Sequence, residues 1–232
     1  HVRLVNNLNE NDAMHLPADI IRALSSECRV YEVGGAVRDR LRHSLCPDTG
    51  RIDVRRFWAY PVEEVDYLVT GLAMESLLGI LKKHGRVDLA GRAFGVIKFS
   101  FRTEKGSRRT TDIALPRREA STGHGHRDFR IECDPELSVE QDLGRRDFTV
   151  NAIALRLLDG RESRKPPELI DPYSGKRDIG DRLIRMVAPA AFSEDPLRMM
   201  RACQFAARFQ FSLEQKTFRS IRRHAPLIRS VS

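Results

Sequence analysis

The sequence predicts an α/β (α+β) fold. Short runs rich in Val, Ile, Tyr and Phe, which are typical of strands, alternate with segments whose apolar residues recur every three or four positions, as in amphipathic helices. A length of 232 residues is enough for one large domain or two small ones. Apolar residues make up 41% of the chain, so a substantial hydrophobic core is expected.

The composition indicates an anionic partner. The formal net charge is +8 and the isoelectric point is near 9.7. Nucleic acid is the first candidate for such a partner, and a membrane surface is the second. No apolar run approaches the ~20 residues of a transmembrane helix, and the N-terminus lacks the apolar core of a signal peptide. We therefore expect a soluble, cytoplasmic protein that does not enter a membrane.

The cysteines and the chain ends give two further expectations. Cys28, Cys46, Cys133 and Cys203 form no C-x-x-C pair, which argues against a zinc site and against a disulfide framework. The chain does not begin with Met, and it stops soon after a basic, helix-like segment. We expect it to be part of a longer protein, truncated at its C-terminus.

The first helices and strand frame a glycine turn. Residues 11–26 have helical spacing and residues 29–33 are strand-like, and Gly34 and Gly35 then lead into a short helix over 36–42. Two glycines at a strand-to-helix turn let backbone N–H groups approach an anion, and Arg38 could add a bidentate phosphate contact. A tight turn that uses glycine for steric reasons alone is the alternative.

An irregular insertion follows over residues 43–63. It combines arginines with aromatic residues, which suits phosphate contact and base stacking: Arg51, Arg55, Arg56, Phe57 and Trp58. An ordinary surface loop with its aromatic residues packed beneath it is an equal alternative.

Three carboxylates fall on two predicted strands. In the strand 64–70, Glu64 and Asp66 point to the same face, about 7 Å apart, and can share a cation. Asp112 lies within the strand 110–115, where propensity disfavours it, and a shared divalent cation would explain its presence. Solvation at a strand edge is the alternative.

Further elements complete the series. We expect an amphipathic helix over 73–83, strands over 85–89 and 94–102, a helix over 178–186, and a long helix from an N-cap at Ser193 to about 209. Residues 116–137 are polar and broken, so a mobile loop is expected there. His124 and His126 in this loop have no further metal ligand spaced to join them.

The segment 142–152 concentrates charge before a run expected to be helical. Adjacent residues on a helix point about 100° apart, so Arg145 and Arg146 cannot share one exposed stripe, and one of them should face inward or towards a ligand. Phosphate and carboxylate fit the planar guanidinium best. A helix start with its own salt bridges is the alternative. On the long helix, Asp195, Arg198 and Arg201 are three residues apart and share one face, where a simple salt-bridge ladder is the alternative.

Four motifs occur in a fixed order, and together they resemble a known family. They are Gly-Gly-x-Val-Arg-Asp at 34–39, the carboxylate pair at 64 and 66, Arg-Arg-Asp-Phe-Thr-x-Asn-Ala at 145–152, and Glu-Asp-Pro-Leu-Arg-x-x-Arg at 194–201. The chain resembles the class II tRNA nucleotidyltransferase (CCA-adding) and bacterial poly(A) polymerase family from about Val30 to Phe211.

The resemblance implies a fold and a set of roles. It implies a polymerase-β-like nucleotidyltransferase head domain with a mixed sheet over 1–160, followed by a helical neck over 161–232. Glu64, Asp66 and Asp112 would be catalytic, with Glu64 and Asp66 as ligands of two Mg²⁺ ions. The nucleotide would be bound by residues from all the other motifs: Gly34, Gly35, Arg38, Arg145, Arg146, Asn151, Asp195, Arg198 and Arg201.

The resemblance also implies an activity, which is template-independent addition of CMP and AMP, from CTP and ATP, to the 3′ end of tRNA. Poly(A) polymerase activity on RNA 3′ ends is the close alternative, and a catalytically weak RNA-binding head is the second. Three departures from the family bear on this choice. Glu64 stands where the family usually has Asp, Gln204 stands where Arg is common, and the 43–63 insertion is longer than the usual link.

Overall fold

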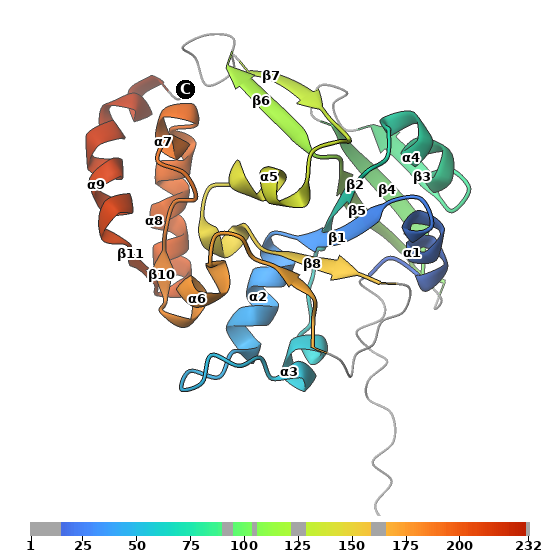
Figure 1. The fold of residues 1–232 in the computed structure, drawn as a ribbon, viewed down its shortest axis with the longest axis horizontal. Coiled ribbons are helices and arrows are strands. Elements are labelled where there is room, and N and C mark those ends of the chain that lie inside the picture. Colours follow the sequence, from blue (N-terminus) through green and yellow to red (C-terminus); the bar gives the residue numbers. More distant parts are fainter. Residues whose placement is uncertain (1–14, 90–94, 104–105, 122–128, 159–165, 231–232) are drawn as a thin grey trace, which may run out of the picture.

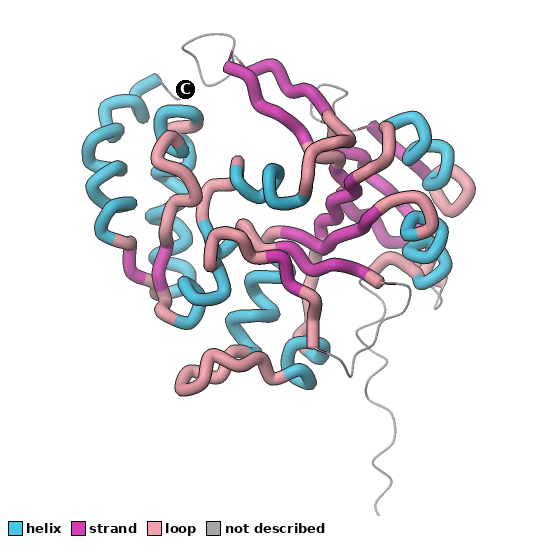
Figure 2. The backbone as a smooth tube through the Cα atoms, in the orientation of Figure 1, coloured by secondary structure: helices cyan, strands magenta, loops and turns pink. Residues whose placement is uncertain are grey.

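A mixed seven-stranded sheet forms the centre of the protein (Figures 1 and 2). The computed structural model describes residues 15–89, 95–103, 106–121, 129–158 and 166–230. The strand order is β3-β4-β5-β2-β1-β8-β9. The bounds are β1 Arg29–Val33, β2 Asp66–Thr70, β3 Arg86–Leu89, β4 Val96–Arg102, β5 Arg108–Ala114, β8 Ala154–Leu157 and β9 Leu169–Ile170. β2 and β5 run parallel and the other neighbours are antiparallel, which confirms the expected mixed sheet.

The helices lie around this sheet and beyond one end of it. Their bounds are α1 Ala18–Ser25, α2 Gly35–Ser44, α3 Val54–Ala59, α4 Met74–Leu81, α5 Val139–Gly144, α6 Gly175–Gly180, α7 Ala191–Glu194, α8 Leu197–Phe209 and α9 Gln215–His224. In Figure 1, α7, α8 and α9 (orange to red) stand together at the opposite end of the molecule from α1 and α4. Two short strands pair in parallel beside these helices. They are β10 Leu183–Ile184, which precedes α7, and β11 Ser212–Leu213, which lies between α8 and α9.

Apolar burial fixes these positions. α1 and α4 pack on the sheet through one cluster that includes Leu24, Leu77 and Phe99, each fully buried. A second cluster joins α2 to the C-terminal helices, and it contains Val37 and Leu41 of α2 together with Phe205 and Phe209 of α8. Burying such side chains contributes about 1.5–3 kcal/mol each. The helix after the glycine turn is therefore held between the sheet and α8.

Most predicted elements are confirmed, and several predictions are wrong. Residues 116–137 are not simply a loop, because β6 Arg117–Ser121 and β7 Phe129–Cys133 pair as an antiparallel hairpin. His124 and His126 lie outside the described residues. The predicted helix 178–186 ends early, because α6 stops at Gly180 and the following residues form β10.

The insertion 43–63 contains the helix α3, which the sequence pattern did not predict. Asp53 caps α3 by accepting a hydrogen bond from the backbone N–H of Arg56, and Phe57 is fully buried beneath it. This corresponds to the alternative in which an aromatic residue packs beneath the loop.

The charged segment 142–152 differs in local structure from its prediction. α5 precedes the arginines and begins with a capping box formed by Ser138 and Gln141. The residues after them form the 3₁₀ turn η2 Thr149–Asn151 and then β8, so the prediction of a helical run after the arginines is wrong.

Within the described ranges, no helix is long and apolar enough to cross a membrane.

Candidate active site

Two of the predicted catalytic carboxylates are neighbours on the sheet. Asp66 begins β2 and lies directly opposite Asp112 in the parallel β2–β5 register. Register partners present their side chains to the same face, so both carboxylates face the same way. Lys98, opposite Asp112 on β4, donates from Nζ to Asp112 Oδ1 at 3.2 Å. The motifs missed Lys98, although its alternation with the buried residues of its strand places it on this face.

The electrostatics of this pair favour a cation. The pKa of Asp66 is raised above its usual value near 3.8, first by burial, then by Asp112 and also by Glu64, while Arg146 and Lys98 lower it. Desolvation and the like charge of Asp112 both disfavour the ionised form of the Asp66 carboxyl. A divalent cation between the two carboxylates would neutralise their charge.

Glu64 is less closely integrated than the other two carboxylates. It lies two residues before the start of β2, outside the register that places Asp66 opposite Asp112. Among the residues that the structure describes, no group of three or more His, Cys, Asp or Glu is arranged to hold a metal ion. The fit for a metal therefore rests on Asp66 and Asp112, with Glu64 near them in sequence.

The glycine turn lies against the carboxylates. Gly34 has φ +76° and ψ −133°, a backbone conformation almost confined to glycine, and it is the N-cap of α2. A Cβ on Gly34 would lie 3.4 Å from Arg146 Nη1 and 3.7 Å from Asp66 Oδ2. Three motifs that are far apart in the sequence therefore meet at this residue.

Asp142 holds both arginines of the charged segment. Its side chain is 0% exposed, and it accepts hydrogen bonds from Arg145 Nε at 2.8 Å and from Arg146 Nη2 at 3.4 Å. Burial lowers the pKa of Arg146, and Asp142 opposes that effect. Arg146 Nε is buried and has no acceptor in the described part of the chain. Leaving such a donor unpaired costs about 1–3 kcal/mol, so it marks a position for a ligand oxygen.

A second carboxylate, Asp147, ties the segment to two helices. It accepts from Asn151 Nδ2 at 3.0 Å and from Arg201 Nε at 2.8 Å. Asn151 Oδ1 in turn accepts from Arg38 Nη1 at 2.7 Å. The Arg38 guanidinium lies over the ring of Phe209, 4.5 Å from its centroid, a packing partner that the motifs did not indicate.

Charged residues of α8 also contact the charged segment 142–152. Arg198 is buried, donates from Nη2 to the backbone oxygen of Arg145 at 2.9 Å, and pairs with Glu194 at 3.3 Å. Its Nε lies 3.9 Å from Asp195 Oδ2. Ser193 lies inside α7 and is not the predicted N-cap of the long helix; Asp195 Oδ1 instead accepts from the N–H of Leu197.

The structure therefore joins the predicted site residues other than Glu64 through one chain of contacts. It runs from Asp112 and Asp66 through the Gly34 turn and Arg146 to Asp142, and onward through Arg145 to Arg198. A branch through Asp147 reaches residues on α2 and α8. These contacts link the face of the sheet that carries Asp66 and Asp112 to the α8 helix.

The mixed sheet, paired carboxylates and glycine turn are those of a nucleotidyltransferase head domain. The family model described as poly A polymerase head domain matches residues 30–185, and the chain belongs to this family. Nucleotidyltransferases of this family use divalent metal ions.

Two similar curated relatives carry the same name. The "Multifunctional CCA protein" of Paracidovorax citrulli is 37% identical over 195 residues, which cover 84% of this chain and 39% of that protein. The protein of the same name from Alkalilimnicola ehrlichii is 40% identical over 182 residues, covering 78% of this chain and 35% of its own length. The chain thus spans less than half the length of these relatives.

Solved structures agree on the fold. The Bacillus stearothermophilus CCA-adding enzyme in complex with CTP superposes with a TM-score of 0.67 at 27% identity, covering 98% of this chain and 46% of that one. A tRNA nucleotidyltransferase complexed with a primer tRNA and an incoming ATP analog gives a TM-score of 0.61 at 28% identity, covering 90% and 50%.

Proposed function

We propose that this chain adds CMP and AMP, from CTP and ATP, to the 3′ end of tRNA without a template. The observation that carries the proposal is the Asp66–Asp112 pair beside the Gly34 turn and the unpaired Arg146 Nε. The relatives named as CCA proteins, and the related structures that hold CTP or a primer tRNA, support this choice of substrates.

The reaction is an in-line displacement at the α-phosphorus of the nucleotide. The RNA 3′-hydroxyl oxygen bonds to that phosphorus, the bond to the bridging oxygen breaks, pyrophosphate leaves, and the hydroxyl proton passes to water. Asp66 and Asp112, assisted by Glu64, would hold two Mg²⁺ ions, whose charge when bound favours the attacking and leaving oxygens.

The chain's own cations position the triphosphate. The backbone at Gly34 and Gly35 offers N–H groups at the start of α2, and Arg146 Nε offers a buried donor. Arg38 and Asn151, hydrogen-bonded to each other, form the next contact surface for phosphate or ribose.

Base recognition belongs to the α8 side of the site. Asp195 and Arg198 would hydrogen-bond the edge of the base, since a carboxylate and a guanidinium together satisfy both donors and acceptors. Arg145 supports Arg198 through its backbone oxygen, and Arg201 supports Asp147. We propose that residues 1–160 form the head and residues 161–232 the neck; the edge strand β9 of the sheet comes from the second part.

Three tRNA substrates test the function directly. They end before the first C, before the second C and before the terminal A of CCA, and each is incubated with the protein, Mg²⁺ and labelled CTP or ATP. CCA addition predicts C, C and A as the next nucleotides. Repeated A on all three tRNAs would indicate poly(A) polymerase, for which the family match is the supporting observation. If no nucleotide is incorporated into any of the three tRNAs, the proposed nucleotidyltransferase activity is refuted.

The base-reading role has its own test. Arg198→Ala should change the ratio of A to C incorporated more than it changes the KM for either triphosphate. An unchanged ratio would show that Arg198 does not recognise the base.

A further inference from the structure

Two arginines oppose each other across the end of the β4–β5 hairpin. Arg102 and Arg108 are register partners, and both are exposed. Like charges directly opposite in an antiparallel pair are destabilising. In the described part of the chain, no carboxylate is bonded to either guanidinium, and the hairpin turn is closed by its own bonds, with Thr103 N–H donating to Ser107 O at 2.9 Å.

The local sequence does not neutralise this pair. Residues 102–109 contain four cations, Arg102, Lys105, Arg108 and Arg109, against one carboxylate, Glu104. Residues 104 and 105 lie outside the described ranges and together add no net charge. The net charge of residues 102–109 is therefore positive, and this end of the hairpin would attract an anion from outside the chain.

The arginine pair lies on the same sheet face as the catalytic carboxylates. Asp112, Thr110 and Arg108 alternate along β5 and therefore point to one side. Their partners on β4 are Lys98, Ser100 and Arg102. Four residues along a strand span about 13 Å, so a polar track of that length leads from Asp112 to the arginine pair.

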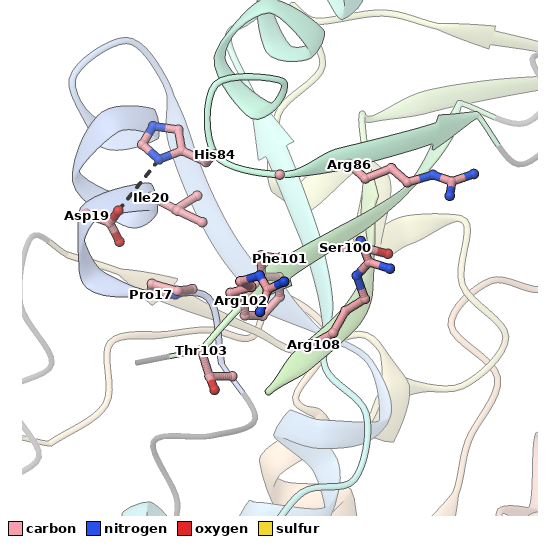
Figure 3. Close-up of a pocket in the computed structure, with 11 residues that line it drawn as sticks. Pro17, Asp19, Ile20, His84, Arg86, Ser100, Phe101, Arg102, Thr103 and Arg108 are labelled. Atoms are coloured by element: carbon pink, nitrogen blue, oxygen red, sulfur yellow. Dashed lines mark ion pairs between the residues drawn. The ribbon is translucent and has the colours of Figure 1, made fainter. Parts of the chain in front are cut away.

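A cavity of about 550 Å³ lies at the far end of this track (Figure 3). Arg86, Arg102 and Arg108 line it from three strands. Figure 3 also shows His84 and Asp19 at another side of the cavity, where they form an ion pair at 3.6 Å. Arg86 is paired with Asp88 at 3.2 Å, an exposed pair that solvent screens. The lining therefore carries an excess of positive charge.

We propose that the Arg102–Arg108 pair binds a backbone phosphate of the RNA substrate, upstream of its 3′ end. This inference rests on the proposed function for the location of the 3′ end at Asp66 and Asp112. A stacked strand advances about 3.4 Å per nucleotide, so 13 Å corresponds to about four nucleotides. Ser100 and Thr110 are hydrogen-bonded to each other at 2.7 Å on the track, and the hydroxyl that accepts in this bond offers one further donor along the path.

Matched variants of neighbouring arginines test the site. Arg108→Ala and Arg109→Ala remove the same charge from the same strand, but Arg109 alternates to the opposite face. Binding of a fluorescent eight-nucleotide single-stranded RNA is measured by anisotropy over a range of salt concentrations. We expect Arg108→Ala to weaken binding three- to tenfold and to reduce the slope of log K against log salt by about 0.7, with little change for Arg109→Ala.

Two further readouts locate the contact and exclude unfolding. A single uncharged methylphosphonate linkage about four nucleotides from the 3′ end should weaken binding to the wild-type chain but not to Arg108→Ala. The melting temperature of Arg108→Ala should be unchanged or higher, because a like-charge contact is removed.

Two outcomes would refute the proposed phosphate site. One is an equal loss of affinity in Arg108→Ala and Arg109→Ala, and the other is a methylphosphonate effect that is the same in wild type and Arg108→Ala. Either would mean that the RNA is attracted only by the overall positive charge. These binding measurements require no nucleotide transfer. Their failure is therefore separate from a failure to incorporate CMP or AMP.

Discussion

At the scale of single residues, the site combines groups that are unfavourable without a ligand. The raised pKa of Asp66 means that its charged form is disfavoured in the folded, metal-free chain. Arg146 Nε is a buried donor with no acceptor in the described residues. A divalent cation would relieve the first feature, and a phosphate oxygen of a bound nucleotide would relieve the second.

The Asp66 carboxylate should therefore reduce stability in the absence of metal. We expect Asp66→Asn to raise the melting temperature of the metal-free chain at neutral pH. Because the folded-state pKa is raised, the wild-type chain gains stability as pH falls through that pKa, and the difference from the variant narrows. Mg²⁺ should raise the melting temperature of the wild type alone. A variant less stable than the wild type at neutral pH would contradict this account.

Arg146 and Arg145 should differ in function although both bind Asp142. Arg146→Lys keeps the charge but loses the planar fork, so we expect the KM for ATP to rise about tenfold. Arg145→Lys is the matched control, with a smaller change, since no donor of Arg145 is known to be buried and unpaired. Steady-state kinetics with both variants measure this, and equal KM values would contradict it.

At the scale of elements, the position of α2 is fixed by the turn at Gly34 before it and by an ion pair of Arg40 within it. Its start depends on the Gly34 conformation, and its interior carries Arg40, which is 1% exposed and paired with Glu32 of β1, also 1% exposed. His15 completes this buried group through Glu32 Oε1 at 2.7 Å and Arg40 Nη2 at 3.0 Å. The orientation of α2 thus depends on one turn that requires glycine and on one buried ionic group.

Gly34→Ala should damage both stability and binding. The backbone conformation costs a non-glycine residue about 1–3 kcal/mol. The new Cβ would fit at van der Waals distance from Arg146 and Asp66, so the loss comes from a change in the backbone of the turn between these two side chains. Gly79→Ala in α4 is the control, because a Cβ there would meet nothing within 4 Å outside its own helix backbone, and alanine favours helix by about 0.5–1 kcal/mol. Urea unfolding and the KM for ATP measure both effects. A Gly34→Ala chain as stable as the wild type would refute the strain.

Breaking the buried ionic group should be costly. Glu32→Ala leaves Arg40 buried without its carboxylate, and we expect a loss of about 3–5 kcal/mol in the free energy of unfolding. The double variant Glu32→Ala/Arg40→Ala should lose less than the sum of the single variants. Chemical denaturation of all three variants measures the coupling, and strictly additive losses would show that the pair does not interact.

At the scale of the whole molecule, the sequence motifs predicted the mixed sheet and the order of most elements. Alternation and helical spacing were sufficient where one face of an element is buried, as in β4 and α8. They failed at β6 and β7, which form a separate two-stranded hairpin outside the main sheet, and at β10, whose two residues pair only with β11. These pairings are set by contacts distant in sequence, which local periodicity does not report.

The same distinction between local sequence pattern and contacts distant in sequence applies to the candidate site. The carboxylates and arginines could be identified by type and spacing. Their pairing could not, because Asp142 accepts from both Arg145 and Arg146, whereas Asp147 accepts from Arg201 on α8. Lys98 and Phe209 were not identified, because their roles depend on strand register and on how α8 packs against α2.

The central claim is that Asp66 and Asp112 support nucleotide transfer. Single-turnover incorporation of labelled CMP into tRNA lacking its CCA end measures it, with Asp66→Ala and Asp112→Ala compared against Asp88→Ala. Asp88 is the matched control, because it is an exposed carboxylate opposite Lys98 on β3 and outside the Asp66–Asp112 pair. We predict that incorporation is lost in the first two variants and retained in the third. Undiminished incorporation by Asp66→Ala would contradict the account.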